Sequence, residues 1–93
     1  MTVGVLQLRL RIPENQSLKG KRQVLLSLKD RIRKKFNVSV AETEDHDKWQ
    51  VATLTVACVG VDQPVVDRTL NHVAEFAGRD REAELLDIQM EFI

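Results

Sequence analysis

The sequence predicts an α+β fold in which two helices cover one face of a four-stranded antiparallel sheet. Three observations support this prediction. Some segments alternate between apolar and polar residues, two others repeat their apolar residues with helical spacing, and the elements follow one another in the order β-α-β-β-α-β. A chain of 93 residues fits a single domain, residues 1–93, with one two-layer core.

The first two elements are an alternating strand over residues 3–12 and a helix over residues 17–36. Pro13 ends the strand, and Ser17 is a good N-cap for the helix-forming residues that follow. The strand places on its inward face Leu6, Leu8, Leu10 and Ile12. The helix carries one apolar stripe, formed by Leu18, Leu25, Leu28, Ile32 and Phe36.

A hairpin follows, with a short strand over residues 38–42, a polar loop over 43–48 and a long strand over 49–59. Alternation divides the long strand into two faces. Its inward residues are Ala52, Leu54, Val56 and Cys58. Its outward residues are Trp49, Val51, Thr53, Thr55 and Ala57. Cys58 is therefore expected to be a buried, unreactive thiol.

The last two elements are a helix capped by Asp62 and a strand over residues 86–93. Pro64 fits the first turn of this helix, and Gly78 is the expected stop. The element order is that of the ferredoxin-like fold, and right-handed crossovers give the strand order 4-1-3-2. One core should bury Leu6, Leu8, Leu10, Leu25, Leu28, Ile32, Leu54, Val56, Leu70 and Val73.

Charge is unevenly distributed along this chain, although 14 basic and 14 acidic residues leave it formally neutral. Residues 9–35 hold ten bases and only two acids, a net charge of +8, so the rest of the chain carries −8. Such asymmetry suggests a surface for a polyanion. The alternative is a solvated basic helix that acidic neighbours neutralise, because the acidic hairpin 42–47 should lie at the same edge of the sheet.

The start of the first helix is the strongest candidate site, because helix N-termini bind phosphates and this one also carries bases. We expect one of two arrangements for Lys21 and Arg22. Either they form ion pairs with the acidic hairpin, or they bind an external anion. The candidate RNA- or anion-binding residues are Ser17, Lys19, Lys21, Arg22, Lys29 and Arg33, with Arg9 and Arg11 near the same edge. Leu26 lies among the outward bases.

The second candidate surface is the sheet face that no helix covers. Its only aromatic residue is Trp49 at a strand end, so base stacking across the sheet is not expected. A face rich in Val, Thr and Ala suits a protein contact or a homodimer instead. The candidate interface residues are Val5, Val51, Thr53 and Thr55.

Several segments resemble a small bacterial family, the YlxP-like family, a domain of unknown function known by the number 503. The resemblance rests on Ser17–Arg22, on Phe36–Glu42 and on Trp49-Gln50, with the opening Val-Gly-Val and the closing Leu-Leu-Asp. It implies a ferredoxin-like fold. Genes of the family commonly lie among genes for transcription termination and translation initiation, which implies a connection with RNA or the ribosome and no enzymatic activity.

We therefore expect a non-enzymatic accessory protein that contacts ribosomal RNA or a ribosomal subunit, or else a module that homodimerises or docks a partner through the open sheet. No nucleophile–base pair or acid pair assembles. His46 among flexible acids does not fix a metal geometry. No small-molecule cofactor, metal or membrane contact is expected. The single cysteine and the lack of a signal peptide or membrane span suggest a cytoplasmic protein.

Overall fold

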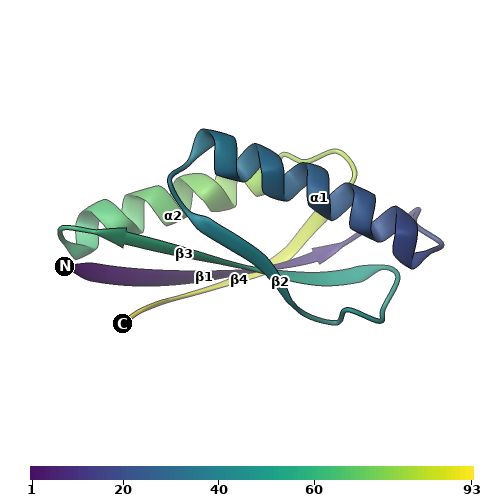
Figure 1. Ribbon diagram of the computed structural model, residues 1–93, viewed down its shortest axis with the longest axis horizontal. Coiled ribbons are helices and arrows are strands. Elements are labelled where there is room, and N and C mark those ends of the chain that lie inside the picture. The colour runs from purple at the N-terminus through teal and green to yellow at the C-terminus, as the bar shows by residue number, and fades with distance from the viewer.

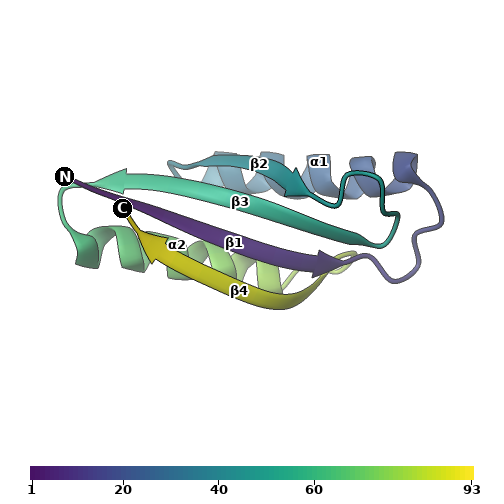
Figure 2. The ribbon, with the colours of Figure 1, turned by 90° about the horizontal axis from the view of Figure 1, so that it is seen from below.

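The computed structural model covers residues 1–93 and has the predicted order of elements. These are β1 (Thr2–Arg11), α1 (Leu18–Lys35), β2 (Ser39–Glu44), β3 (Val51–Gly60), α2 (Gln63–Gly78) and β4 (Glu84–Phe92). The four strands form one antiparallel sheet in the order β2-β3-β1-β4, which is the predicted 4-1-3-2 order. Both helices lie on one face of this sheet (Figure 1), and the other face is open (Figure 2).

The core lies between the helices and the sheet, and the predicted inward residues form it. Leu8 of β1 lies opposite Leu54 of β3, and each is fully buried. All ten residues of the predicted core are at most 2% exposed. Cys58, also predicted to point inward, is 6% exposed. The prediction of which strand and helix residues point into the core is therefore confirmed.

Both helices begin at the predicted caps. The Ser17 hydroxyl accepts a hydrogen bond from the Gly20 amide at 3.0 Å, and the Asp62 carboxylate accepts one from the Val65 amide at 3.0 Å. Phe36 lies just outside α1 in extended backbone, and its ring packs edge-on against Phe76 of α2. Gly78 is the last residue of α2 and not a stop beyond it.

Three strands differ clearly from the prediction. β2 continues to Glu44, two residues beyond the predicted end, through a register shift between Glu42 and Glu44. β3 begins at Val51, so Trp49 lies in the β2–β3 loop and not on the sheet. β4 begins at Glu84, and its register against β1 shifts between Arg9 and Leu10. This bulge leaves Leu86 as an extra residue that is 46% exposed. No helix in the structure combines the length and the apolar character that a membrane span requires.

Candidate functional site

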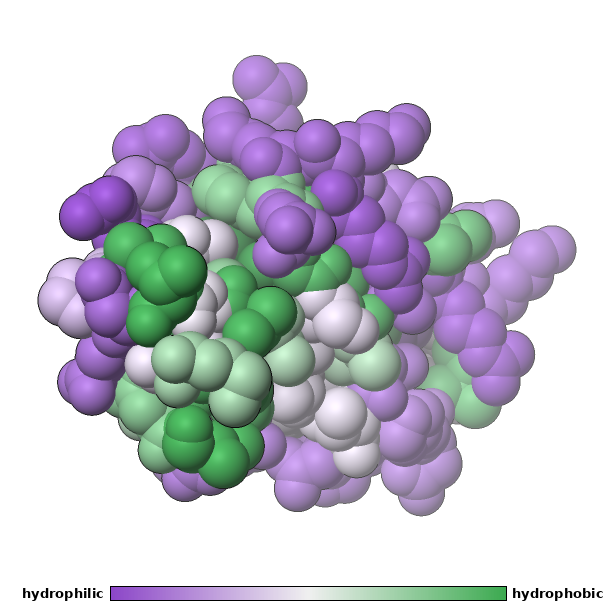
Figure 3. Space-filling view, turned by 60° about the vertical axis from the view of Figure 1, so that its left-hand side comes forward, coloured by the Kyte–Doolittle hydropathy of each residue, from purple (hydrophilic) through white to green (hydrophobic).

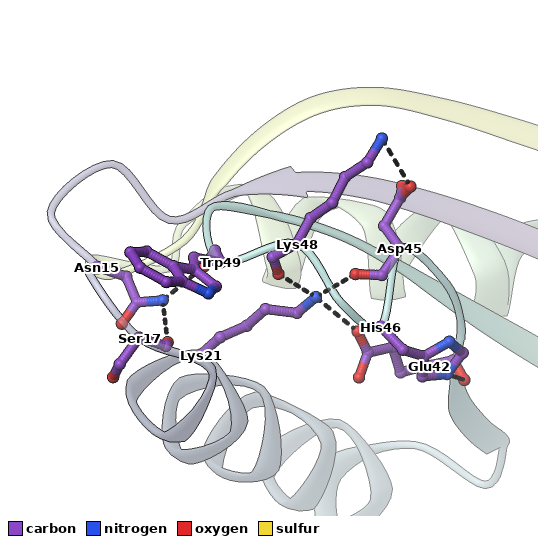
Figure 4. A network of polar contacts seen from close by, with 8 residues as sticks. All are labelled: Asn15, Ser17, Lys21, Glu42, Asp45, His46, Lys48 and Trp49. Carbon is purple, nitrogen blue, oxygen red and sulfur yellow. Dashed lines mark hydrogen bonds and ion pairs between the residues drawn. The ribbon is translucent and has the colours of Figure 1, made fainter.

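Lys21 anchors the start of α1 to the β2–β3 hairpin. Its ammonium nitrogen lies 2.6 Å from the carbonyl oxygen of Asp45, 2.7 Å from that of Lys48 and 3.0 Å from the carboxylate of Glu42 (Figure 4). The Lys21 side chain is 1% exposed and that of Glu42 is 16% exposed. Three oxygens therefore surround an ammonium that has three N–H groups to donate.

Because its ammonium is buried among these oxygens, Lys21 is not available to an external phosphate, and the expectation of a phosphate contact is corrected. The alternative of internal pairing with the acidic hairpin describes Lys21. It does not extend to Arg22, which is exposed and has no ion-pair partner. The hairpin therefore neutralises one base at the start of α1 and leaves the others free.

Asn15 makes a second connection between the β1–α1 loop and the hairpin. Its amide nitrogen donates to the carbonyl oxygens of Ser17 and Trp49, and Gln50 donates back to the Asn15 carbonyl at 3.0 Å. A Cβ atom at Gly20 would overlap the Asn15 side-chain oxygen, which explains a glycine in the first turn of α1. The backbone of Trp49 is thus fixed, while its side chain is 53% exposed beside α1 (Figure 4).

The outer face of α1 carries bases that no acid neutralises. Arg31 pairs with Asp80 at 2.6 Å, and Arg33 lies 3.4 Å from Asp30 and donates to the Val40 carbonyl at 2.8 Å. The α1 bases without an ion-pair partner are Lys19, Arg22, Lys29, Lys34 and Lys35. Leu26 lies on the same helix face and is 55% exposed. We call Lys19, Arg22, Leu26, Lys29 and Lys34 the α1 basic face.

Arg9 and Arg11 do not extend the α1 basic face. They belong to the outward set of β1, so they lie on the open side of the sheet, which separates them from α1. Arg11 also pairs with Glu84 of β4 at 3.2 Å. The single basic track expected from the sequence is therefore two separate regions, because the sheet passes between them.

The open sheet face has one polar and one apolar end. Of the predicted interface residues, Val5, Val51 and Thr55 are half-buried, whereas Thr53 is only 5% exposed and offers little contact surface. Apolar side chains gather at the end of the molecule where the two chain termini lie (Figure 3). The exposed large apolar residues there are Met1, Val59 and Ile93 along the sheet, and Val61 and Val65 just before and at the start of α2.

Asp80 fixes the connector between α2 and β4. Its carboxylate accepts hydrogen bonds from Arg31 at 2.6 Å and from the amides of Glu82 and Ala83 at 3.0 and 2.8 Å. Burial by itself raises the pKa of this carboxyl, but the hydrogen bonds from Arg31 and the two amides outweigh it. The pKa of Asp80 is therefore lowered below its ordinary value.

The remaining candidate residues have structural contacts. His46 lies 3.1 Å from the carbonyl oxygen of Glu42, at the free edge of β2. No group of three or more His, Cys, Asp or Glu side chains is placed to hold a metal ion. Cys58 is a buried free thiol whose sulfur is 3.9 Å from the Val59 carbonyl.

Residues 3–90 match the family described as "Protein of unknown function (DUF503)". The chain belongs to the DUF503 family. The sequence resemblance to YlxP-like proteins is thus confirmed. Among DUF503 relatives, the chain is 37% identical over 60 residues to "Uncharacterized protein YlxP" of Bacillus subtilis (strain 168), a match that spans 64% of this chain and 65% of that protein.

Two designed proteins superpose on this DUF503 chain. "De novo designed protein Foldit4" superposes with a TM-score of 0.53 at 13% identity, over 98% of this chain and 96% of the other. "De novo designed protein Ferredog-Diesel" gives a TM-score of 0.48 at 15% identity, over 98% and 84% of the two chains. At this identity the first similarity supports the ferredoxin-like fold and nothing about function.

Proposed function

We propose that the protein is a non-enzymatic accessory protein that binds RNA, and ribosomal RNA in particular, through the α1 basic face. The observation that carries the proposal is that Lys19, Arg22, Lys29 and Lys34 have no ion-pair partner, although acidic residues outnumber basic ones in the rest of the chain. Uncompensated like charges on one helix repel one another, and an anionic partner relieves that repulsion.

The shape of the face also suits a phosphate backbone. The first turn of α1 has no acidic residue, so its free amides and the positive end of the helix dipole add to the side-chain charge. Exposed Leu26 gives an apolar contact between the bases. Contacts of this kind recognise phosphates and shape and do not read base sequence.

The test changes Lys19, Arg22 and Lys29 together to Gln, which removes three charges and keeps helix propensity. Arg33 is left intact because it donates to the Val40 carbonyl. A matched control changes Arg68, Arg79 and Arg81 to Gln, which removes the same charge from exposed positions outside α1.

Binding to ribosomal subunits and to structured RNA is measured by sedimentation over a series of salt concentrations. The α1 variant should weaken binding and lower the salt slope by about 2–3 units, since each lost phosphate contact removes about one. The control should bind like the parent. Equal binding by all three proteins would show that α1 is only a solvated face.

A second candidate function is docking of a protein partner on the open sheet, which the exposed apolar end of that face favours. Val59→Glu places a charge at the apolar end of this face, on a residue of β3 that is 64% exposed. If the face binds a partner, this variant should lose that partner and keep its melting temperature. The loss should be insensitive to salt, unlike RNA binding, because apolar contact rather than charge would drive it.

A further inference from the structure

The two edge strands of the sheet, β2 and β4, differ in how their outward backbone groups are bonded. On β2, the carbonyl of Val40 accepts a hydrogen bond from Arg33 at 2.8 Å, and the carbonyl of Glu42 lies 3.1 Å from the His46 ring nitrogen. Side chains thus lie against two carbonyl groups of this short edge. Proteins commonly protect edge strands in ways that prevent pairing with another chain.

The β4 edge carries a bulge at Leu86 and three acids, but no side chain bonds its outward backbone groups. The Ile93 amide donates to the Val3 carbonyl at 2.7 Å, so Ile93 and every second residue before it direct their backbone groups at β1. The residues between them, Ile88, Met90 and Phe92, therefore direct their N–H and C=O groups away from the sheet. No side chain donates a hydrogen bond to the backbone of β4.

Two apolar side chains along this edge, those of Leu86 and Ile88, are exposed. Ile88 lies opposite the buried Leu8 and is still 41% exposed, and Leu86 at the bulge is 46% exposed. β4 has nine residues, three more than β2. A long edge strand with free backbone groups and exposed aliphatic side chains is a template for another strand.

We propose that the β4 edge pairs antiparallel with β4 of a second copy of this chain, with the two-fold axis at Ile88. In this register Ile88 faces Ile88 of the second copy, and Met90 faces Leu86 of the second copy. Gln89 faces Asp87 of the second copy, so a neutral amide meets a carboxylate.

The sequence of β4 supports a second copy as the occupant. About the Ile88 centre none of the three acids, Glu84, Asp87 and Glu91, lies opposite another acid. Their partners are Phe92, Gln89 and Leu85 of the second copy. Self-complementarity of this kind is what a two-fold interface requires. Pairing would join the sheets into eight strands and leave α1, which packs over β2, exposed. The proposal therefore does not depend on RNA binding.

The test uses the full chain and measures its mass in solution by sedimentation equilibrium. The parent should have twice the mass of one chain. Ile88→Lys and Ile88→Glu should each reduce the mass to that of one chain, because each places like charges opposite each other at the axis. An equimolar mixture of the two variants should recover the double mass, since Lys then faces Glu. Recovery also shows that both variants are folded.

Val51→Glu, on the open face, is the matched control and should keep the double mass. A parent that remains at the mass of one chain at its highest soluble concentration would overturn the proposal. Ile88 variants that still dimerise would also overturn it. A mixture of the two variants that stays at the mass of one chain would do the same. A Val51→Glu variant that becomes monomeric would place the interface on the open sheet and would also overturn it.

Discussion

A buried lysine ammonium needs an oxygen partner for each N–H group, and Lys21 has three, from Glu42, Asp45 and Lys48. Lys21→Ala would leave the partly buried Glu42 carboxylate unpaired and the Lys48 carbonyl without this donor, while the Asp45 carbonyl would keep only the Lys48 amide. Removing one partner of a buried pair costs about 3–5 kcal/mol. We expect the free energy of unfolding, measured with urea, to fall by about 3 kcal/mol.

Lys19→Ala provides the control for this variant, because Lys19 lies in the same helical turn, is exposed and makes no ion pair. Its effect should be within about 0.5 kcal/mol. If the two substitutions cost the same, the contacts of Lys21 add nothing to stability. The expected difference would also show that α1 and the hairpin depend on each other.

Gly20 and Asn15 should be energetically coupled. In the parent, Gly20→Ala forces Asn15 to move and weakens its hydrogen bonds to Ser17 and Trp49. In an Asn15→Ala background the clash is absent, and alanine should stabilise the helix by about 0.5–1 kcal/mol relative to glycine. A double-mutant cycle of unfolding free energies measures the coupling. Equal effects of Gly20→Ala in both backgrounds would contradict this contact.

Asp80 should make stability depend on acid pH. Its pKa is lower in the folded protein than in the unfolded chain, so the unfolded chain binds more protons as the pH falls. The stabilisation is complete above the ordinary pKa of an aspartate and is lost as the pH falls through the lowered folded value. Asp80→Asn should be less stable at neutral pH, and urea unfolding should show the gap to the parent closing in acid. A difference in unfolding free energy that stays constant with pH would exclude this contribution of the Asp80 carboxylate to stability.

The residues of the core and the caps could be predicted because each depends on local pattern. Pairing of Lys21 with the hairpin was one of the two expected alternatives, but the burial of Lys21 was not predicted, although the sequence contained a signal for it. Lys21 precedes Leu25, Leu28 and Ile32 by four, seven and eleven residues, so the helical period places it on the buried side. A charged residue is normally assigned to solvent, and only the hairpin, far along the chain, supplies the oxygens that allow its burial.

At the scale of elements, the edge of β2 is protected by two side chains, Arg33 and His46, that lie against its outward carbonyls. Changing Arg33 to Met and His46 to Ala frees the carbonyls of Val40 and Glu42. We expect faster aggregation on warming, measured by light scattering, because an exposed edge then accepts another strand. Melting temperature should change little, since both side chains are on the surface.

The control for the β2 edge changes Arg22 to Met and His72 to Ala, the same residue types at exposed positions that make no hydrogen bond. This pair should aggregate like the parent. If it aggregates as fast as the edge variant, then lost surface charge, and not the freed carbonyls, is the cause.

The periodicity of apolar residues predicted the type and order of the elements. It did not predict where β3 and β4 begin. Trp49 continues the alternation of β3, yet the hydrogen bond from Asn15 to its carbonyl holds it in the loop. The bulge in β4 places Leu86 out of phase with Ile88, so alternation within β4 could not show where the strand begins. Both differences arise from contacts with a distant segment, which a local pattern does not contain.

At the scale of the whole molecule, the charge asymmetry of the sequence becomes a spatial one. The long axis of the molecule is 42 Å, so charges at opposite ends are screened from each other at physiological salt, where the Debye length is about 8 Å. The neutral net charge therefore does not describe what a partner meets at α1. A polyanion meets the α1 basic face as a local positive patch.

This local patch gives a quantitative expectation for RNA binding. Only the four bases of the α1 basic face, which have no ion-pair partner, should release counterions, namely Lys19, Arg22, Lys29 and Lys34. With about 0.7 units for each phosphate contact on a single strand, the slope of log K against log salt should be about −3. The ten bases of residues 9–35 acting together would give about −7. Fluorescence anisotropy of a labelled single-stranded RNA at several salt concentrations measures the slope. A value near −7 would mean that RNA breaks the Arg31–Asp80 and Lys21–Glu42 pairs, and a value near zero would mean that phosphates are not bound.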